Sequence, residues 1–203
     1  MTLLLPALRA PAPVPCLWPG STVVCLGTGP SLSADDVAYV QGKARVIAIN
    51  DAYTLAPWAD VLYGCDAKWW TWHRGVPGFA GLKFGLQPGA KHWKGVVLVA
   101  KTGGSGIEWR RTGIRTGNNS GYQAINLAIH LGAVRILLLG YDMQGQHFFG
   151  RHRDGSVPPF AVCLKNFATM VPELAAHGIE VINCTRKTAL TCFPRLPLAE
   201  ALP

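Results

Sequence analysis

The sequence predicts a doubly wound α/β fold with a mainly parallel sheet in a single domain. Short runs rich in Val, Ile and Leu alternate with longer amphipathic stretches, and a glycine turn follows the first run directly. The runs are apolar almost throughout, as in Ile136-Leu137-Leu138-Leu139. Strands covered on both faces have this character, and helical stretches between them supply parallel crossovers. These features are typical of a Rossmann-like architecture.

Six segments are expected to form the strands. They are 22–26, 45–49, 60–63, 96–100, 135–139 and 179–183. Residues 1–20 precede them and contain five prolines between positions 6 and 19. Proline at this density excludes helix, so we expect an extended arm outside the core, followed by the Rossmann-like domain in residues 21–203.

Two helices are well defined by the sequence. The first spans 120–131 and ends at Gly132, where a left-handed terminator belongs. Its candidate capping residues are Asn118, Asn119 and Ser120. The second spans 160–177 and is closed by Gly178, with Pro172 expected to kink it or split it into two.

Residues 69–94 are rich in Gly, Trp and basic side chains and show no clear periodicity. We expect an irregular excursion or lid there, of the kind that often carries specificity. Trp69, Trp70 and Trp72 fit two roles, either stacking on a base or sugar or forming a core edge beneath a loop.

Composition bounds the partners. The formal net charge of +8 favours an anionic partner, whether nucleotide, nucleic acid or phosphorylated substrate. The longest apolar runs fall short of the roughly 20 residues needed to cross a bilayer, so no membrane partner is expected. The start is a poor signal peptide. The six cysteines form no CxxC pair and fit buried free thiols in the reducing cytoplasm.

Ligands of open α/β sheets bind beyond the carboxyl ends of the strands, and polar loops follow several strands here. The first strand runs into Gly27, Thr28, Gly29, Pro30 and Ser31. Its glycines allow the backbone to approach an anion, and Ser31 or Ser33 can cap a helix whose N–H groups point at that anion. A plain tight connection fits the same turn.

Further candidate binding residues lie in later loops. Asn50 and Asp51 follow the second strand and can read a base edge or ribose, although helix capping explains them equally. Asp66 follows the third strand. A second anion or sugar site is expected at the N-terminus of the helix 120–131. Its candidate residues are Asn118, Asn119, Ser120 and Gly121.

The segment after the strand 135–139 carries candidates for proton transfer. Histidine titrates near neutrality, so His147 or His152 can remove a proton from an attacking hydroxyl. An exposed loop with histidines in surface contacts is the alternative. Asp142 with both histidines can coordinate a cation, but their spacing matches no standard signature, and no metal site is predicted.

Several nucleotide and nucleophile motifs do not occur. The sequence has neither a GxxxxGK[ST] loop nor a GxSxG elbow, and Leu32 stands where the dinucleotide fingerprint needs its third glycine. P-loop phosphoryl transfer, α/β-hydrolase chemistry and NAD or FAD binding are therefore disfavoured. We expect no tightly bound cofactor.

Two motifs carry a family resemblance. The run GTGPSL at 27–32 resembles the GNGPSL opening of the bacterial sialyltransferases of glycosyltransferase family 42, and of MptE-like proteins that include 6-hydroxymethylpterin diphosphokinases. Residues 120–143 resemble their later segment, which ends in G-x-D-F. Asn50 and residues 182–185 extend the likeness, which runs discontinuously from about residue 22 to 193. Short phage-encoded proteins look similar too.

The resemblance implies roles for particular residues. In the sialyltransferases the first loop and the asparagine after the second strand hold a cytidine nucleotide, and the serine loop contacts its phosphate or sugar. The positions that correspond are Gly27, Thr28, Gly29, Asn50, Asn119, Ser120 and Gly121. His147 or His152 corresponds to the base beyond the G-x-D strand. Thr28 stands where the family has asparagine, and no pair of tyrosines follows Asp142.

Together with the resemblance, these observations predict a metal-independent, glycosyltransferase-like transferase. Its substrate is expected to be a nucleotide or nucleotide sugar, from which it moves a group to an acceptor hydroxyl. One alternative is an MptE-like diphosphokinase that uses ATP and a divalent metal. Another is a phage protein that binds or sequesters a nucleotide without turnover. The positive charge and the phage likeness also fit an anionic or nucleic-acid acceptor, such as a modified DNA base.

Overall fold

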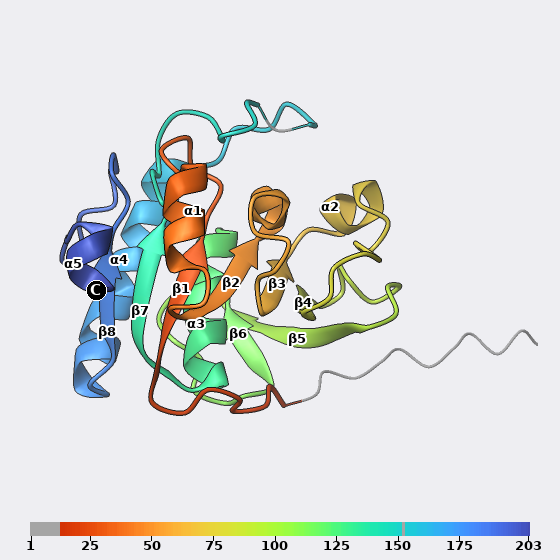
Figure 1. Ribbon diagram of the computed structural model, residues 1–203. Helices are drawn as coiled ribbons and strands as arrows, with labels where there is room; N and C mark the ends of the chain where they lie inside the picture. Colours follow the sequence, from red (N-terminus) through yellow and green to blue (C-terminus); the bar gives the residue numbers. More distant parts are fainter. Residues whose placement is uncertain (1–12, 152) are drawn as a thin grey trace, which may run out of the picture.

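The computed structural model describes residues 13–151 and 153–203. Within them, eight parallel strands form one sheet in the order β6-β5-β4-β3-β2-β1-β7-β8 (Figure 1). The strands are β1 Ser21–Leu26, β2 Arg45–Ile49, β3 Val61–Gly64, β4 Leu82–Leu86, β5 Val96–Gly103, β6 Gly113–Arg115, β7 Ala133–Leu139 and β8 Glu180–Asn183. The helices are α1 Ala34–Val40, the 3-10 helix η1 Asn50–Thr54, α2 Ala67–Trp72, α3 Ser120–Leu131, α4 Phe160–Ala176 and α5 Leu198–Ala201.

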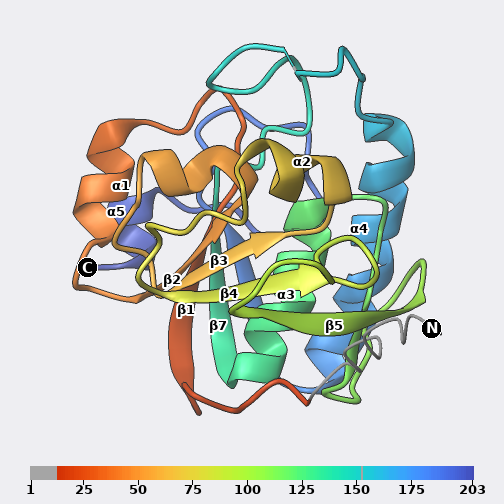
Figure 2. The same ribbon diagram turned by 90° about the vertical axis from the view of Figure 1, so that its right-hand side faces the viewer.

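Helices cover both faces of the sheet, so the predicted doubly wound α/β fold is confirmed (Figure 2). Side chains alternate between the faces along each strand. Val23 and Cys25 of β1 pack in one core with α3 and α4. Val24 and Leu26 pack in a second core with α1 and α2. Burial on both faces is the reason for the continuous apolar runs.

The strand order reverses next to β1. From β1 the chain adds β2 to β6 in one direction, and then returns through α3 to place β7 on the free side of β1. The connection leaving β1 therefore leads to β2 on one side of the sheet, and the connection leaving β7 leads to β8 on the other side. Such a switch point leaves a crevice at the carboxyl ends of its strands, where ligands of this fold class bind.

All six predicted strands are present, but β4 and β6 were not predicted. The expectation of an irregular excursion over 69–94 is wrong, because this stretch contains most of α2 and all of β4. The sequence of β4, Leu-Lys-Phe-Gly-Leu, breaks the apolar run with a lysine and a glycine. Gly85 is required by packing, since a Cβ there would overlap the Ala90 side chain. Trp69 and Trp70 are buried in the core. Of the two roles expected for them, this is the role at a core edge rather than stacking on a base or sugar.

The predicted helix 120–131 is α3, with the expected ends. Asn119 is its N-cap and Gly132 its left-handed terminator at φ +107°. The second predicted helix is also present, but the split expected at Pro172 does not occur, since α4 runs unbroken from Phe160 to Ala176. Pro172 and Ala168 are both exposed. The carbonyl that loses its amide partner to proline therefore lies on the solvent side of the helix.

The N-terminal arm differs from expectation in its burial. Residues 13–17 form neither helix nor strand. Val14 and Trp18 are nevertheless buried in the core, at 0% and 8% exposure. The Trp18 N–H donates to the Leu131 carbonyl at 2.7 Å. Placing the arm outside the core was therefore wrong for these two residues, and residues 1–12 lie outside the described part.

All six cysteines are free, and Cys25, Cys163 and Cys184 are buried, as expected of core thiols. Among the described residues, no helix combines the length and the apolar character that a membrane crossing requires.

Candidate functional site

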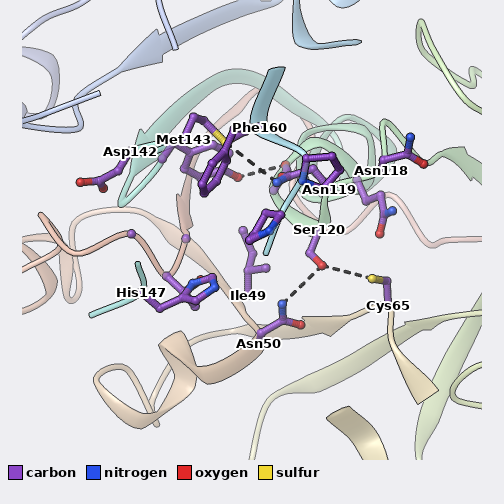
Figure 3. A pocket seen from close by; sticks show the side chains of 18 of the residues that line it. Ile49, Asn50, Cys65, Asn118, Asn119, Ser120, Asp142, Met143, His147 and Phe160 are labelled. Atoms are coloured by element: carbon purple, nitrogen blue, oxygen red, sulfur yellow. Dashed lines mark hydrogen bonds between the residues drawn. The ribbon is translucent and has the colours of Figure 1, made fainter. Parts of the chain in front are cut away.

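A cavity of about 470 Å³ lies at the carboxyl ends of the strands, at the switch point. The loops after β1, β2, β3 and β7 and the N-terminus of α3 line it (Figure 3). The predicted site residues in its lining are Gly27, Thr28, Gly29, Asn50, Asp66, Asn118, Asn119, Ser120, Gly121, Asp142 and His147. Those outside the lining are Pro30, Ser31 and Asp51. His152 lies outside the described residues.

The glycines of the first loop serve the contact between the loops after β1 and β7. Their N–H groups donate to the β7 end, Gly27 to the Leu139 carbonyl at 2.7 Å and Gly29 to the Gly140 carbonyl at 2.8 Å. A Cβ on Gly27 would lie 2.6 Å from the Gly140 oxygen, and one on Gly29 would overlap the Asp142 carboxylate. Both amides point to β7, so the reason for these glycines is packing between loops.

Asp142 ties the two loops together. It is 2% exposed, and its carboxylate accepts from the Ser31 N–H at 3.1 Å and from the Ser31 hydroxyl at 2.8 Å. Burial raises the pKa of Asp142, and the two bonds from Ser31 oppose that rise. Ser33, rather than Ser31, caps α1, in a reciprocal capping box with Asp36. Residues 30–36 do not line the cavity, so α1 adds no amide to it.

The N-terminus of α3 faces the cavity instead. The Asn119 side chain accepts from the Tyr122 N–H at 3.1 Å, and the Asn119 N–H donates to the Thr116 carbonyl. Among the described residues, nothing accepts from the backbone N–H groups of Ser120 and Gly121. First-turn N–H groups and the helix dipole attract anions. Two free donors therefore remain for a ligand at this end of the cavity.

The residues that directly follow β2 and β3 hold the Ser120 hydroxyl. Asn50, at φ +48°, donates from Nδ2 to Ser120 Oγ at 3.3 Å, and Cys65 Sγ lies 3.2 Å from the same oxygen (Figure 3). Burial raises the pKa of Cys65 to about 12, so its thiol stays protonated near neutrality. Asn50 Oδ1 is buried without a hydrogen-bond partner among the described residues. The asparagine thus links the second strand to the start of α3.

Asp51 points away from the cavity and joins η1 to α2. Its carboxylate accepts from Trp69 Nε1 at 2.9 Å and lies 3.1 Å from His73 Nε2. The Tyr53 hydroxyl lies 3.0 Å from Nδ1 of the same histidine. The positive φ of Asn50 turns the chain at this point. As a result, the Asn50 side chain faces the cavity and the Asp51 side chain faces α2.

His147 enters the cavity from the segment after β7, which turns sharply at Met143 with φ +52°. Its Nδ1 lies 2.7 Å from Thr28 Oγ1, and the N–H of Phe148 donates to the Thr28 carbonyl at 2.9 Å. The His147 ring stacks on Phe149 at 4.9 Å between centroids. This histidine therefore has a defined place against the first loop.

Two later residues of this segment contact α2. Asp154 pairs with Lys68 at 3.5 Å, and the Arg153 guanidinium lies 5.5 Å from the centre of the Trp72 ring.

His130, in α3, is 4% exposed, and its Nε2 lies 2.8 Å from the Gly113 carbonyl oxygen. Its place is the core rather than the cavity, as expected for a packed histidine.

The lining has further members. Cys65, Thr116, Gly140 and Tyr141 belong to the polar loops that the sequence singled out. The residues that were not predicted are Ile49, Leu86, Lys101, Gln123, Met143, Gln144, Gln146 and 156–160. Leu86 is the last residue of β4, and the strand-end rule would have found it had β4 been predicted. Lys101 directly follows the predicted end of its strand at residue 100 and lies near the end of β5 in the structure. Within 13–151 and 153–203, no group of three or more His, Cys, Asp or Glu is arranged to hold a metal ion.

No protein-family model matches the chain, and no curated protein matches it. Two solved structures are similar. The first is the MAf glycosyltransferase from Magnetospirillum magneticum AMB-1, at TM-score 0.64 and 11% identity over 94% of this chain and 35% of that one. The second is the sialyltransferase CstII from Campylobacter jejuni with cytidine-5'-monophosphate, at TM-score 0.49 and 12% identity over 88% and 86%.

The chain spans about a third of the length of the MAf glycosyltransferase. At 11% identity the similarity shows the fold alone. The parallel sheet with its helices is a glycosyltransferase-like, Rossmann-like α/β fold.

Proposed function

We propose that this protein is a transferase that binds a nucleotide or nucleotide sugar in the switch-point cavity and delivers a group from it to an acceptor hydroxyl. One observation carries the proposal. Ser120 and Gly121, whose N–H groups have no acceptor among the described residues, line the same cavity as His147. An anion-binding helix end and a group able to take a proton thus border one space.

The cavity provides for the separate parts of such a ligand. A phosphate accepts from the two α3 amides and the Ser120 hydroxyl, and the dipole of the helix supplements these bonds. The Asn50 side chain lies beside them and contacts the base or ribose. A volume of about 470 Å³ falls within the range of small-molecule sites. The similarity of fold to a glycosyltransferase supports the reaction class.

In the proposed reaction, His147 accepts the proton of the acceptor hydroxyl. The acceptor oxygen forms a bond to the sugar carbon that carries the nucleotide, and the bond from that carbon to the phosphate oxygen breaks. The electron pair of the broken bond leaves with the nucleotide. The α3 amides stabilise the negative charge that develops on the phosphate.

Calorimetry tests the binding step. Purified protein is titrated with CMP, UDP, GDP and ADP and their sugar conjugates, and we expect at least one to bind. Ser120→Ala should weaken that ligand by about 10- to 100-fold, as for one lost hydrogen bond to a charged group. Ser105→Ala is the control, since Ser105 is exposed and lies outside the lining. Folded wild-type protein that binds none of these ligands contradicts the proposal.

A His147→Gln variant tests the transfer step. We expect it to bind the same ligand with similar affinity and to lose roughly 10²- to 10⁴-fold in turnover, which is the usual contribution of a general base. Turnover is measured as release of the free nucleotide from the bound nucleotide sugar, in the presence and absence of EDTA. Binding without turnover in the wild type would leave a nucleotide-binding protein without transferase activity.

A further inference from the structure

Thr28 makes two contacts with the segment that carries His147. Its Oγ1 lies 2.7 Å from His147 Nδ1, and its carbonyl accepts from the Phe148 N–H at 2.9 Å. The segment closes on itself beside these contacts, because His147 and Gly150 exchange two backbone hydrogen bonds at 3.0 and 2.9 Å. Residue 28 therefore meets both the backbone and the ring of the candidate base.

The Thr28 hydroxyl is itself held in place. The residue follows β1, which is buried from Val23 to Leu26, and lies between two glycines whose N–H groups donate to the end of β7. A β-branched side chain has few χ1 rotamers, so the direction of Oγ1 is restricted. The sheet thus fixes the oxygen that the imidazole meets.

A neutral imidazole carries its proton on only one ring nitrogen. For His147 to accept a proton at Nε2, its own proton has to be on Nδ1, where it needs an acceptor. Thr28 Oγ1 lies within hydrogen-bond distance of that nitrogen, and a hydroxyl oxygen can accept. Asp142, on the same segment, accepts from Ser31 instead.

We propose that Thr28 is a positioning residue for His147. Its hydroxyl accepts the Nδ1–H of the neutral ring and so fixes both the ring orientation and the tautomer that leaves Nε2 as the proton acceptor. The proposal rests on the proposed role of His147 as a base. When the acceptor hydroxyl gives its proton to Nε2, the Nδ1 proton stays in its bond to Thr28, and the imidazolium is held in place.

The test is the ring tautomer of His147, read from long-range ¹H–¹⁵N spectra of labelled protein at a pH where the ring is neutral. The His147 signals are assigned by their loss in His147→Gln. We expect the proton on Nδ1 in the wild type and in Thr28→Ser, which keeps the hydroxyl. Thr28→Val keeps the shape and the backbone bond but removes the acceptor, and should lose the preference for Nδ1–H.

Activity provides the second readout. In Thr28→Val, kcat should fall, by less than the roughly 10²- to 10⁴-fold cost of losing the base itself, with KM little changed. Thr28→Ser should restore most of the rate, which a role in packing alone would not predict.

A wild-type ring protonated on Nε2, or a tautomer unchanged by Thr28→Val, overturns the assignment. The wild-type spectrum decides the matter even if Thr28→Val fails to fold. These spectra need no substrate, so they separate the two proposals. If the His147 proton is on Nδ1 but the protein binds no nucleotide, the proposed function alone is refuted. If the protein binds a nucleotide but the His147 ring shows no preference for Nδ1–H, the role of Thr28 alone is refuted.

Discussion

Asp142 accepts two hydrogen bonds from Ser31, one from its N–H at 3.1 Å and one from its hydroxyl at 2.8 Å. The pair joins the loop after β7 to the loop after β1 across the switch point. Asp142 lines the cavity, whereas Ser31 lies outside the lining. The shape of one cavity wall therefore depends on a residue that does not touch the cavity.

Replacing Ser31 with Ala should destabilise the protein by about 1.5–3 kcal/mol, because one hydrogen bond to a buried carboxylate is lost. Urea denaturation measures the change. Ser105→Ala, at an exposed position, should stay within about 0.5 kcal/mol of the wild type. Equal stability of the two variants would mean that the Ser31 hydroxyl contributes nothing to this junction.

Stability should fall as the pH drops below about 6.5, in part through His130. Burial lowers the pKa of His130 below its usual 6.5. The unfolded chain then takes up a proton at a higher pH than the folded protein, so stability is intact above 6.5 and declines between the unfolded and the folded pKa. The slope contributed by one such group is at most about 1.4 kcal/mol per pH unit.

Denaturation at pH 5, 6 and 7 tests this effect. His130→Gln keeps a donor for the Gly113 carbonyl and should show a shallower decline. His92→Gln removes an exposed histidine and should keep the wild-type slope. An unchanged slope in His130→Gln would assign the pH dependence to other groups.

Gly29→Ala should destabilise the fold by about 1–3 kcal/mol or more, since the new methyl group overlaps the Asp142 carboxylate and lies 2.6 Å from the Gly140 oxygen. The melting temperature reports the loss. A Cβ on Gly78 meets nothing within 4 Å, so Gly78→Ala is the matched control and should be neutral or slightly stabilising. Similar melting temperatures for both would refute the close loop contact.

Trp18→Ala should cost about 3–5 kcal/mol, as expected for truncating a large buried side chain. Leu17, its neighbour, is 43% exposed, and Leu17→Ala should change stability by no more than about 0.5 kcal/mol. Guanidinium denaturation compares the two. A small effect of Trp18→Ala on stability would indicate that this part of the arm is exposed to solvent.

The elements that could be predicted are those whose pattern arises within one segment. The capped helix α3 and the apolar strands β1, β2 and β7 have local signals, and their predicted bounds lie within two residues of those observed. The strand β4 was missed because Gly85 interrupts its apolar pattern. That glycine is required by its contact with Ala90, which lies outside the strand. The proline count correctly excluded helix in residues 13–20. The burial of Trp18, however, depends on where α3 ends.

The candidate site was predictable in outline for the same reason. Strand ends of a parallel sheet meet at one edge, so loops far apart in sequence were expected to share a cavity, and the loops near residues 28 and 119 do. Which side chain of a loop faces inward depends on backbone turns. The φ of +48° at Asn50 sends Asp51 toward α2, and the bond to Asp142 withdraws Ser31.

The account depends on one phosphorylated ligand in the cavity that the loop near residue 28 and the start of α3 line together. Backbone amide shifts during a nucleotide titration, followed by NMR, test this most directly. We predict that the amides of Thr28, Ser120 and Gly121 shift together and saturate with a single Kd. Shifts confined to one loop, or no saturable shift in either loop with any nucleotide, would contradict it.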